Sequence, residues 1–130
     1  MKYKLAIIDD EEKILVSLKR YFTLKNFHVD TFTNPKDAYV AIKKHHHKLV
    51  LTDINMPGID GLELLKRLKH HNPLIQVIIM TGNATAEKVR TALTQGASGF
   101  VVKPFDSLQM LEKEVDKALN VFESGLHRHR

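Results

Sequence analysis

The 130-residue chain contains no cysteine, and this absence excludes two classes of site at once. Without a thiol the chain forms no disulfide and holds no metal ion through thiolate ligands. No stretch approaches the roughly 20 consecutive apolar residues that a membrane-spanning helix needs. The start of the chain, Met1-Lys2-Tyr3-Lys4-Leu5, also lacks the apolar core of a signal peptide. We therefore expect a soluble, cytoplasmic protein that does not enter a membrane.

Internal repeats and linker-like stretches are missing as well. The length suits one domain with a real core, and the contents of 43% hydrophobic and 27% charged residues are ordinary for a globular protein. We expect a single domain over residues 1–123. Residues 124–130 are expected to form a polar tail or the start of a linker.

The formal net charge of +5 raises the question of an anionic partner such as nucleic acid. The lysines, however, are scattered from Lys2 to Lys117, and no aromatic residues interleave with them. A nucleic-acid site needs a concentrated patch, which this distribution does not provide. We expect a generally basic surface and no direct nucleic-acid binding by this domain.

Short apolar runs alternate with segments of helical periodicity. The runs predict strands at residues 5–8, 29–32, 49–52, 76–80 and 99–102. Helices are predicted over residues 11–25, from an Asn34 N-cap onward, from an Asp60 N-cap to about 71, over 85–95, and from an Asp106 N-cap to about 122. Five strands and five helices in strict alternation predict a parallel α/β sheet with helices on both faces.

Polar side chains stand where four of these strands end. Asp9 and Asp10 follow the first strand, Asp53 the third, Thr81 the fourth and Lys103 the fifth. The carboxyl ends of parallel strands share one edge of the sheet, which is where such sheets bind ligands. Three carboxylates at one edge suit a hard divalent cation, and Mg²⁺ is favoured because it takes oxygen ligands and keeps several waters.

The charges of this group suit phosphoryl transfer. Three carboxylates and one ammonium leave an excess of two negative charges, which one Mg²⁺ would offset. Lys103 and the cation would then stabilise the oxygens of a phosphoryl group, and an aspartate can attack phosphorus to form an acyl phosphate. Each residue alone has an ordinary structural interpretation: acids at a helix start stabilise the helix dipole, as we conclude for Glu11 and Glu12.

Four stretches carry a resemblance that covers residues 3–122. In order along the chain they are IIDDEE, LVLTDINMPGIDGLELL, VIIMTG and GASGFVVKPF. They resemble the receiver domain of bacterial two-component response regulators. The resemblance implies a doubly wound, flavodoxin-like fold with strand order 2-1-3-4-5. It also implies a phosphorylated signalling protein whose only catalysis is its own aspartyl phosphorylation and dephosphorylation.

The resemblance also assigns roles to the residues at the strand ends. Asp53 would accept a phosphoryl group from a sensor histidine kinase. Asp10, Asp53 and the backbone carbonyl of Asn55 would ligate Mg²⁺, and Asp9 would bind it through water. Lys103 would pair with the carboxylate and then with a phosphoryl oxygen, and the bond to the following proline is expected to be cis.

Further positions match the switch of this family. Thr81 would supply a hydroxyl to the phosphoryl group, and Phe100 would then fill the vacated space, although a plain core role for Phe100 stays open. Phenylalanine carries no hydroxyl, so its inward state should depend less on a polar partner. Asn55 and Asn83 would tune hydrolysis of the acyl phosphate. The face of the fourth helix, last strand and last helix would bind an output domain, a target protein or a second copy in a homodimer.

Alternatives remain open at this point. The receiver could act alone in a phosphorelay, or it could belong to a DNA-binding regulator. A Mg²⁺-dependent aspartyl-phosphate hydrolase is a weaker alternative, because it needs an acid two residues after Asp53, where Asn55 stands. A histidine-rich metal binder is weaker still, because consecutive histidines on a helix point in different directions, and a solvated helix end is the favoured interpretation. Its residues would be His45, His46, His47, His127 and His129.

Overall fold

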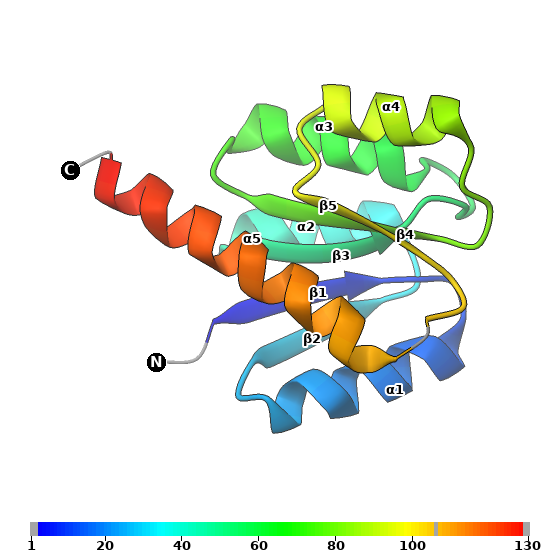
Figure 1. The fold of residues 1–130 in the computed structure, drawn as a ribbon, viewed down its shortest axis with the longest axis horizontal. Coiled ribbons are helices and arrows are strands. Elements are labelled where there is room, and N and C mark those ends of the chain that lie inside the picture. Colours follow the sequence, from blue (N-terminus) through cyan, green and yellow to red (C-terminus); the bar gives the residue numbers. More distant parts are fainter. Residues whose placement is uncertain (1–2, 106, 129–130) are drawn as a thin grey trace.

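The chain folds into one parallel sheet between two layers of helices (Figure 1). The computed structural model describes residues 3–105 and 107–128. The strands are β1 (Lys4–Ile8), β2 (His28–Phe32), β3 (Leu49–Asp53), β4 (Gln76–Thr81) and β5 (Gly99–Val102). Their order is β2-β1-β3-β4-β5, which confirms the predicted fold.

The helices α1 and α5 cover one face of the sheet, and α2, α3 and α4 cover the other (Figure 1). Their bounds are α1 (Glu12–Leu24), α2 (Pro35–His45), α3 (Gly61–His71), α4 (Ala86–Thr94) and α5 (Leu108–Arg128). In the part of the chain that the structure describes, no helix is long and apolar enough to cross a membrane.

The central strands β3 and β4 are largely apolar because both of their faces are covered. Every residue of β3 and β4 is buried. Alternate residues of β1 enter different cores: Leu5 and Ile7 pack under α1 and α5, whereas Ala6 and Ile8 pack under α2 and α3. These two cores fix the register of the strands, and with it the positions of the residues at their ends.

Three predicted helix starts are confirmed by side-chain caps. Asn34 Oδ1 accepts hydrogen bonds from the backbone N–H groups of the first turn of α2, Asp60 Oδ1 does so in α3, and Thr85 Oγ1 does so in α4. The predicted cap of α5, Asp106, lies outside the described residues.

The predicted end of α5 is wrong. We expected the helix to stop near Phe122 and a polar tail to begin at Ser124, but α5 continues to Arg128. Gly125 lies against Leu74, so that a Cβ on this glycine would be 3.1 Å from Leu74 Cδ2. This tight approach gives a packing reason for a glycine inside the helix, where glycine costs about 1 kcal/mol relative to alanine.

The start of α3 packs directly on the end of β3. The Gly61 N–H donates to the Ile54 carbonyl at 2.9 Å. A Cβ on Gly61 would lie 2.0 Å from the carbonyl oxygen of Asp53, a distance that no side chain tolerates. The missing side chain therefore allows the helix to support the main chain of Asp53.

His47 departs from the predicted solvated helix end. His45 and His46 are exposed as expected, but the side chain of His47 is 0% exposed, and its Nε2 lies 2.7 Å from Asp30 Oδ2. His46 takes a left-handed conformation, with φ of 61°, at the end of α2. This turn carries the chain back towards β3 and places the next side chain inside the protein rather than in solvent.

We expect Gly61→Ala to lower the free energy of unfolding by about 1–3 kcal/mol, because the added methyl group forces the Asp53 main chain to move. Urea unfolding measures the loss. Gly82→Ala is the matched control: its Cβ would meet its nearest neighbour, Lys103 Cβ, at 4.0 Å, an ordinary contact. The control should change stability by less than about 0.5 kcal/mol. Equal losses in both variants would contradict the close packing of Gly61.

We expect acid to destabilise the fold through His47. Burial lowers the pKa of His47, the Asp30 carboxylate opposes this shift, and Lys4 and His45 add to it. The folded pKa is thus below the ordinary value of 6.5, so the unfolded state takes up the proton first. The contribution of His47 to the free energy of unfolding is fully present above about pH 6.5. It falls as the pH decreases below that value, by up to about 1.4 kcal/mol per pH unit.

Thermal unfolding in EDTA between pH 7.5 and 5.5 tests this contribution. His47→Gln should flatten the pH dependence of the melting temperature in that range. His70→Gln, at an exposed position on α3, is the control and should leave the wild-type slope intact. Parallel pH profiles for wild type and His47→Gln would show that His47 does not titrate differently on folding.

Candidate functional site

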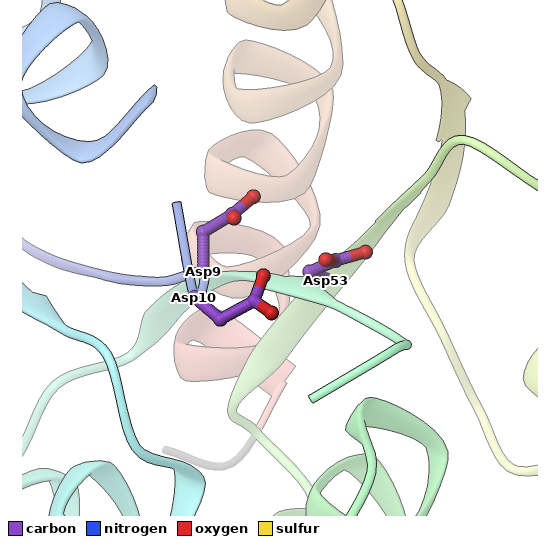
Figure 2. A group of neighbouring side chains, drawn as sticks. All are labelled: Asp9, Asp10 and Asp53. Carbon is purple, nitrogen blue, oxygen red and sulfur yellow. The ribbon is translucent and has the colours of Figure 1, made fainter. Parts of the chain in front are cut away.

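The strand ends bring the predicted carboxylates together. Oxygen atoms of Asp9, Asp10 and Asp53 all lie within 4.8 Å of one another, and Figure 2 shows the three side chains next to each other. Asp9 and Asp10 follow β1, and Asp53 is the last residue of the neighbouring strand β3. The two cores below hold both strands, so the backbones that carry these carboxylates stay side by side.

Asp9 and Asp10 differ in their surroundings. Asp9 is 0% exposed; its Oδ1 accepts the Glu11 N–H at 2.9 Å and its Oδ2 accepts from Lys103 Nζ at 2.5 Å. It therefore also satisfies an N–H at the start of α1, which is the structural role that such acids often have. Asp10 is exposed, and its side chain forms no hydrogen bond or ion pair with the residues that the structure describes.

Asp53 is 6% exposed and has one oxygen already engaged. Its Oδ1 accepts the Ile54 N–H at 2.8 Å, and its Oδ2 lies 3.6 Å from Lys103 Nζ. Burial raises the pKa of Asp53; the Lys103 charge opposes the shift and the Asp9 charge adds to it. The charged form of the Asp53 carboxylate is therefore disfavoured, and the nearby Lys103 ammonium compensates for this only in part.

Lys103 reaches the carboxylates from the end of β5. We expected it to pair with Asp53, but its ammonium lies closer to Asp9. Burial lowers the pKa of Lys103, yet the hydrogen bond and charge of Asp9, with the charge of Asp53, outweigh burial and raise it. The lysine thus stays charged. The Lys103–Pro104 bond is cis, as predicted.

The oxygen donors present fit Mg²⁺. Three carboxylates meet one ammonium, so the group keeps an excess of negative charge. All donors are oxygens, and the exposed position of Asp10 leaves room for the waters that Mg²⁺ retains. Beside this group, Gly82 and Lys103 line a surface cavity of about 460 Å³.

The remaining predicted residues lie at the same edge or just below it. Thr81 ends β4; its side chain is buried and its Oγ1 accepts the Asn83 N–H at 3.2 Å. Asn55 and Asn83 are exposed after β3 and β4. Phe100 pairs in register with Ile79 and packs, half-buried, against the core under α2, α3 and α4.

Sequence reasoning missed two contributors to this site. The Ile54 N–H fixes one oxygen of Asp53, and Gly61 supports its main chain. The backbone donor leaves no signal in the sequence. Gly61 does leave one, because a glycine directly after the N-cap Asp60 is a poor helix former without a packing reason.

Comparisons with known proteins agree with this geometry. The profile of the family described as response regulator receiver domain matches residues 5–115. The DNA-binding transcriptional regulator NtrC of Salmonella typhimurium is 32% identical over 95% of this chain and 25% of its own length. The regulatory protein AtoC of Escherichia coli is 36% identical over 91% of this chain and 25% of its own. The chain thus spans about a quarter of the length of these relatives.

Solved structures show the same fold. A CheY-like receiver domain protein of Methanospirillum hungatei superposes with a TM-score of 0.88 at 27% identity, covering 95% of this chain and 99% of that one. The beryllofluoride-activated NtrC4 receiver domain dimer gives a TM-score of 0.80 at 28% identity, covering 93% and 97%. On the family profile, the relatives and the strand-end carboxylates together, the chain belongs to the receiver domains of two-component response regulators, which are phosphorylation-controlled signalling modules.

Proposed function

We propose that Asp53 is the phosphoacceptor of this receiver, and that a sensor histidine kinase or a small phosphodonor supplies the phosphoryl group. The observation that carries the proposal is the setting of the Asp53 carboxylate. It is nearly buried, has one oxygen on the Ile54 N–H and faces Lys103 with the other. Such a carboxylate is oriented for attack on an electrophile that arrives with a compensating cation.

In the proposed transfer, an Asp53 oxygen attacks phosphorus and forms the new O–P bond. The P–N bond of the phosphohistidine breaks, and the leaving imidazole keeps the electron pair and takes up a proton. Lys103 Nζ, now shared between Asp9 and Asp53, would pair with a phosphoryl oxygen. Asp10, Asp53 and the Asn55 carbonyl would hold Mg²⁺, with Asp9 through water, and the bound cation would offset phosphoryl charge.

The proposed response is a population shift. The Thr81 hydroxyl, now accepting the Asn83 N–H, would turn to donate to a phosphoryl oxygen, and Phe100 would move into the space beneath. The surface made by α4, β5 and α5 would change with it. Leu93 on α4 and Val102 on β5 are exposed apolar residues of that surface, which supports its role in docking. Asn55 and Asn83 would set the rate of acyl-phosphate hydrolysis.

The output is inferred from the relatives. Several of them are named as DNA-binding regulators, and this chain covers only about a quarter of their length. We infer that residues 1–123 form the receiver unit and that it controls an output domain or a target protein. Action as a stand-alone receiver in a phosphorelay is the alternative. An activated receiver dimer is known for NtrC4, which supports homodimerisation of the phosphorylated form here.

We expect Asp53 to gain one phosphoryl group when the protein is incubated with acetyl phosphate and Mg²⁺. Intact-mass measurement should show one addition in wild type and none in Asp53→Asn, because an amide cannot form the acyl phosphate. Asp60→Asn is the matched control, since Asp60 is exposed at the start of α3 outside the cluster. Modification of Asp53→Asn at the wild-type rate would refute the assignment.

We also expect Mg²⁺ to stabilise the fold. With an affinity on the order of 1 mM, about 10 mM Mg²⁺ adds roughly 1.4 kcal/mol by mass action, or a melting shift of roughly 3–6 °C. Asp10→Ala should melt higher than wild type without metal, because it relieves repulsion and removes no hydrogen bond to the described residues. It should also lose the Mg²⁺ response. A destabilised Asp10→Ala beside a wild type indifferent to Mg²⁺ would contradict a metal site.

A further inference from the structure

Six of the eight histidines of this chain lie at the edge of the sheet opposite the carboxylate cluster. Strands begin and helices end at that edge: His28 opens β2, His45, His46 and His47 end α2 and turn to β3, and His70 and His71 end α3. Two of them, His28 and His47, approach the Asp30 carboxylate, and His45 lines the same surface cavity as His28 and Asp30. We propose that His28, Asp30 and His45 bind a divalent transition-metal ion such as Zn²⁺, and that His47 positions Asp30 for it.

His47 holds the carboxylate from below. Its Nε2 lies 2.7 Å from Asp30 Oδ2, and its Nδ1 is a buried atom without a hydrogen-bond partner. With no acceptor for Nδ1, the proton belongs on Nε2, so that His47 donates to Asp30. Metal-binding carboxylates are commonly oriented by such a second hydrogen bond. The side chain of Asp30 is 39% exposed, so part of it remains open to a ligand.

His28 stands at ligand spacing from the same carboxylate. Its Nε2 is 3.7 Å from Asp30 Oδ2, and its side chain is 57% exposed. Two ligands that bind one Zn²⁺ at about 2.1 Å in tetrahedral geometry lie about 3.4 Å apart. A small rotation of the exposed imidazole therefore suffices to place both donors on one ion.

His45 supplies the third donor. It lines the same surface cavity of about 420 Å³ as His28 and Asp30, and its ring centroid is 6.5 Å from that of His47. Within residues 3–105 and 107–128, the carboxylate cluster is the one group of three or more such donors already within 4.8 Å of one another. The histidine site thus closes when the exposed rings of His28 and His45 turn inward. Three ligands leave a fourth position for water.

The surroundings select the kind of ion. Lys4 and Lys19 also line the cavity and oppose any cation there, so binding must come from strong coordinate bonds and not from net charge. Imidazole nitrogen is a good ligand for Zn²⁺, Co²⁺, Ni²⁺ and Cu²⁺ and a poor one for Mg²⁺. The Lys4 ammonium is held at the His45 carbonyl, at 2.9 Å. The proposed site is therefore distinct in chemistry from the carboxylate cluster at the other edge, and it does not depend on the phosphorylation of Asp53.

Co²⁺ is the probe for the test, because it replaces Zn²⁺ and absorbs visible light when four-coordinate. The full chain is titrated with Co²⁺ in excess Mg²⁺, which occupies the carboxylate cluster. Wild type should show one visible-absorbing site that Zn²⁺ displaces. His28→Gln and Asp30→Asn should each weaken binding by at least tenfold. The double variant His70→Gln, His71→Gln, at exposed positions on α3, should bind as wild type does.

Two outcomes would overturn the site. One is equal Co²⁺ binding by wild type and His28→Gln, a surface change that leaves the fold intact. The other is that the visible absorption band is lost when His127 and His129 are replaced but is kept when His28 is replaced. His47 has its own test: His47→Leu should weaken binding about 10- to 100-fold, whereas His47→Gln, which keeps an N–H donor, should weaken it less. Wild-type affinity in both variants would refute the positioning role.

Discussion

Repulsion among three carboxylates is the constraint on which the rest of this site depends. Asp9 and Asp53 are removed from water, and Asp10 lies beside them, so their charges are screened far less than charges on the surface. The apolar cores on both faces of the sheet hold β1 and β3 together and thereby hold the charges together. One ammonium, from Lys103, cannot neutralise them. Hydrophobic burial elsewhere thus maintains a local excess of negative charge that a divalent cation would offset.

Lys103 and Asp9 connect the charge of this site to the neighbouring elements α1, β4 and β5. Asp9 accepts from the start of α1 and from Lys103, and Lys103 is continuous with β5 and donates its backbone N–H to the Thr81 carbonyl. A new negative charge on Asp53 would compete with Asp9 for the ammonium. The ends of β4 and β5 would then respond together, because that backbone hydrogen bond of 2.7 Å joins them. These hydrogen bonds provide a route by which phosphorylation of Asp53 could change the surface formed by α4, β5 and α5.

Local rules predicted most of this fold, and long-range contacts account for what they missed. The strands were predictable because parallel strands buried on both faces are apolar runs, and the strand-end residues followed from the shared edge. The helix starts at Asn34, Asp60 and Thr85 were predictable because each cap bonds within its own first turn. The end of α5 was not, because Ser124 and Gly125 are typical of a helix end, and the packing of Gly125 against Leu74 leaves no signal in the local sequence. Nor was the burial of His47, whose partner Asp30 is 17 residues away.

The two edges of the sheet carry opposite chemistry for one physical reason. In a parallel α/β fold every helix begins at the edge where strands end, so that edge collects the positive ends of the helix dipoles. Acids stand there at the starts of α1, α2, α3 and α4, and basic residues stand in the last turns of α2 and α3. The same dipoles that make three carboxylates tolerable at one edge also favour a phosphoryl group. At the other edge the negative helix ends favour cations, and there the last turns of α2 and α3 carry lysines and imidazoles. The direction of the strands therefore separates an anion-accepting edge from an edge rich in nitrogen donors before any particular side chain is chosen.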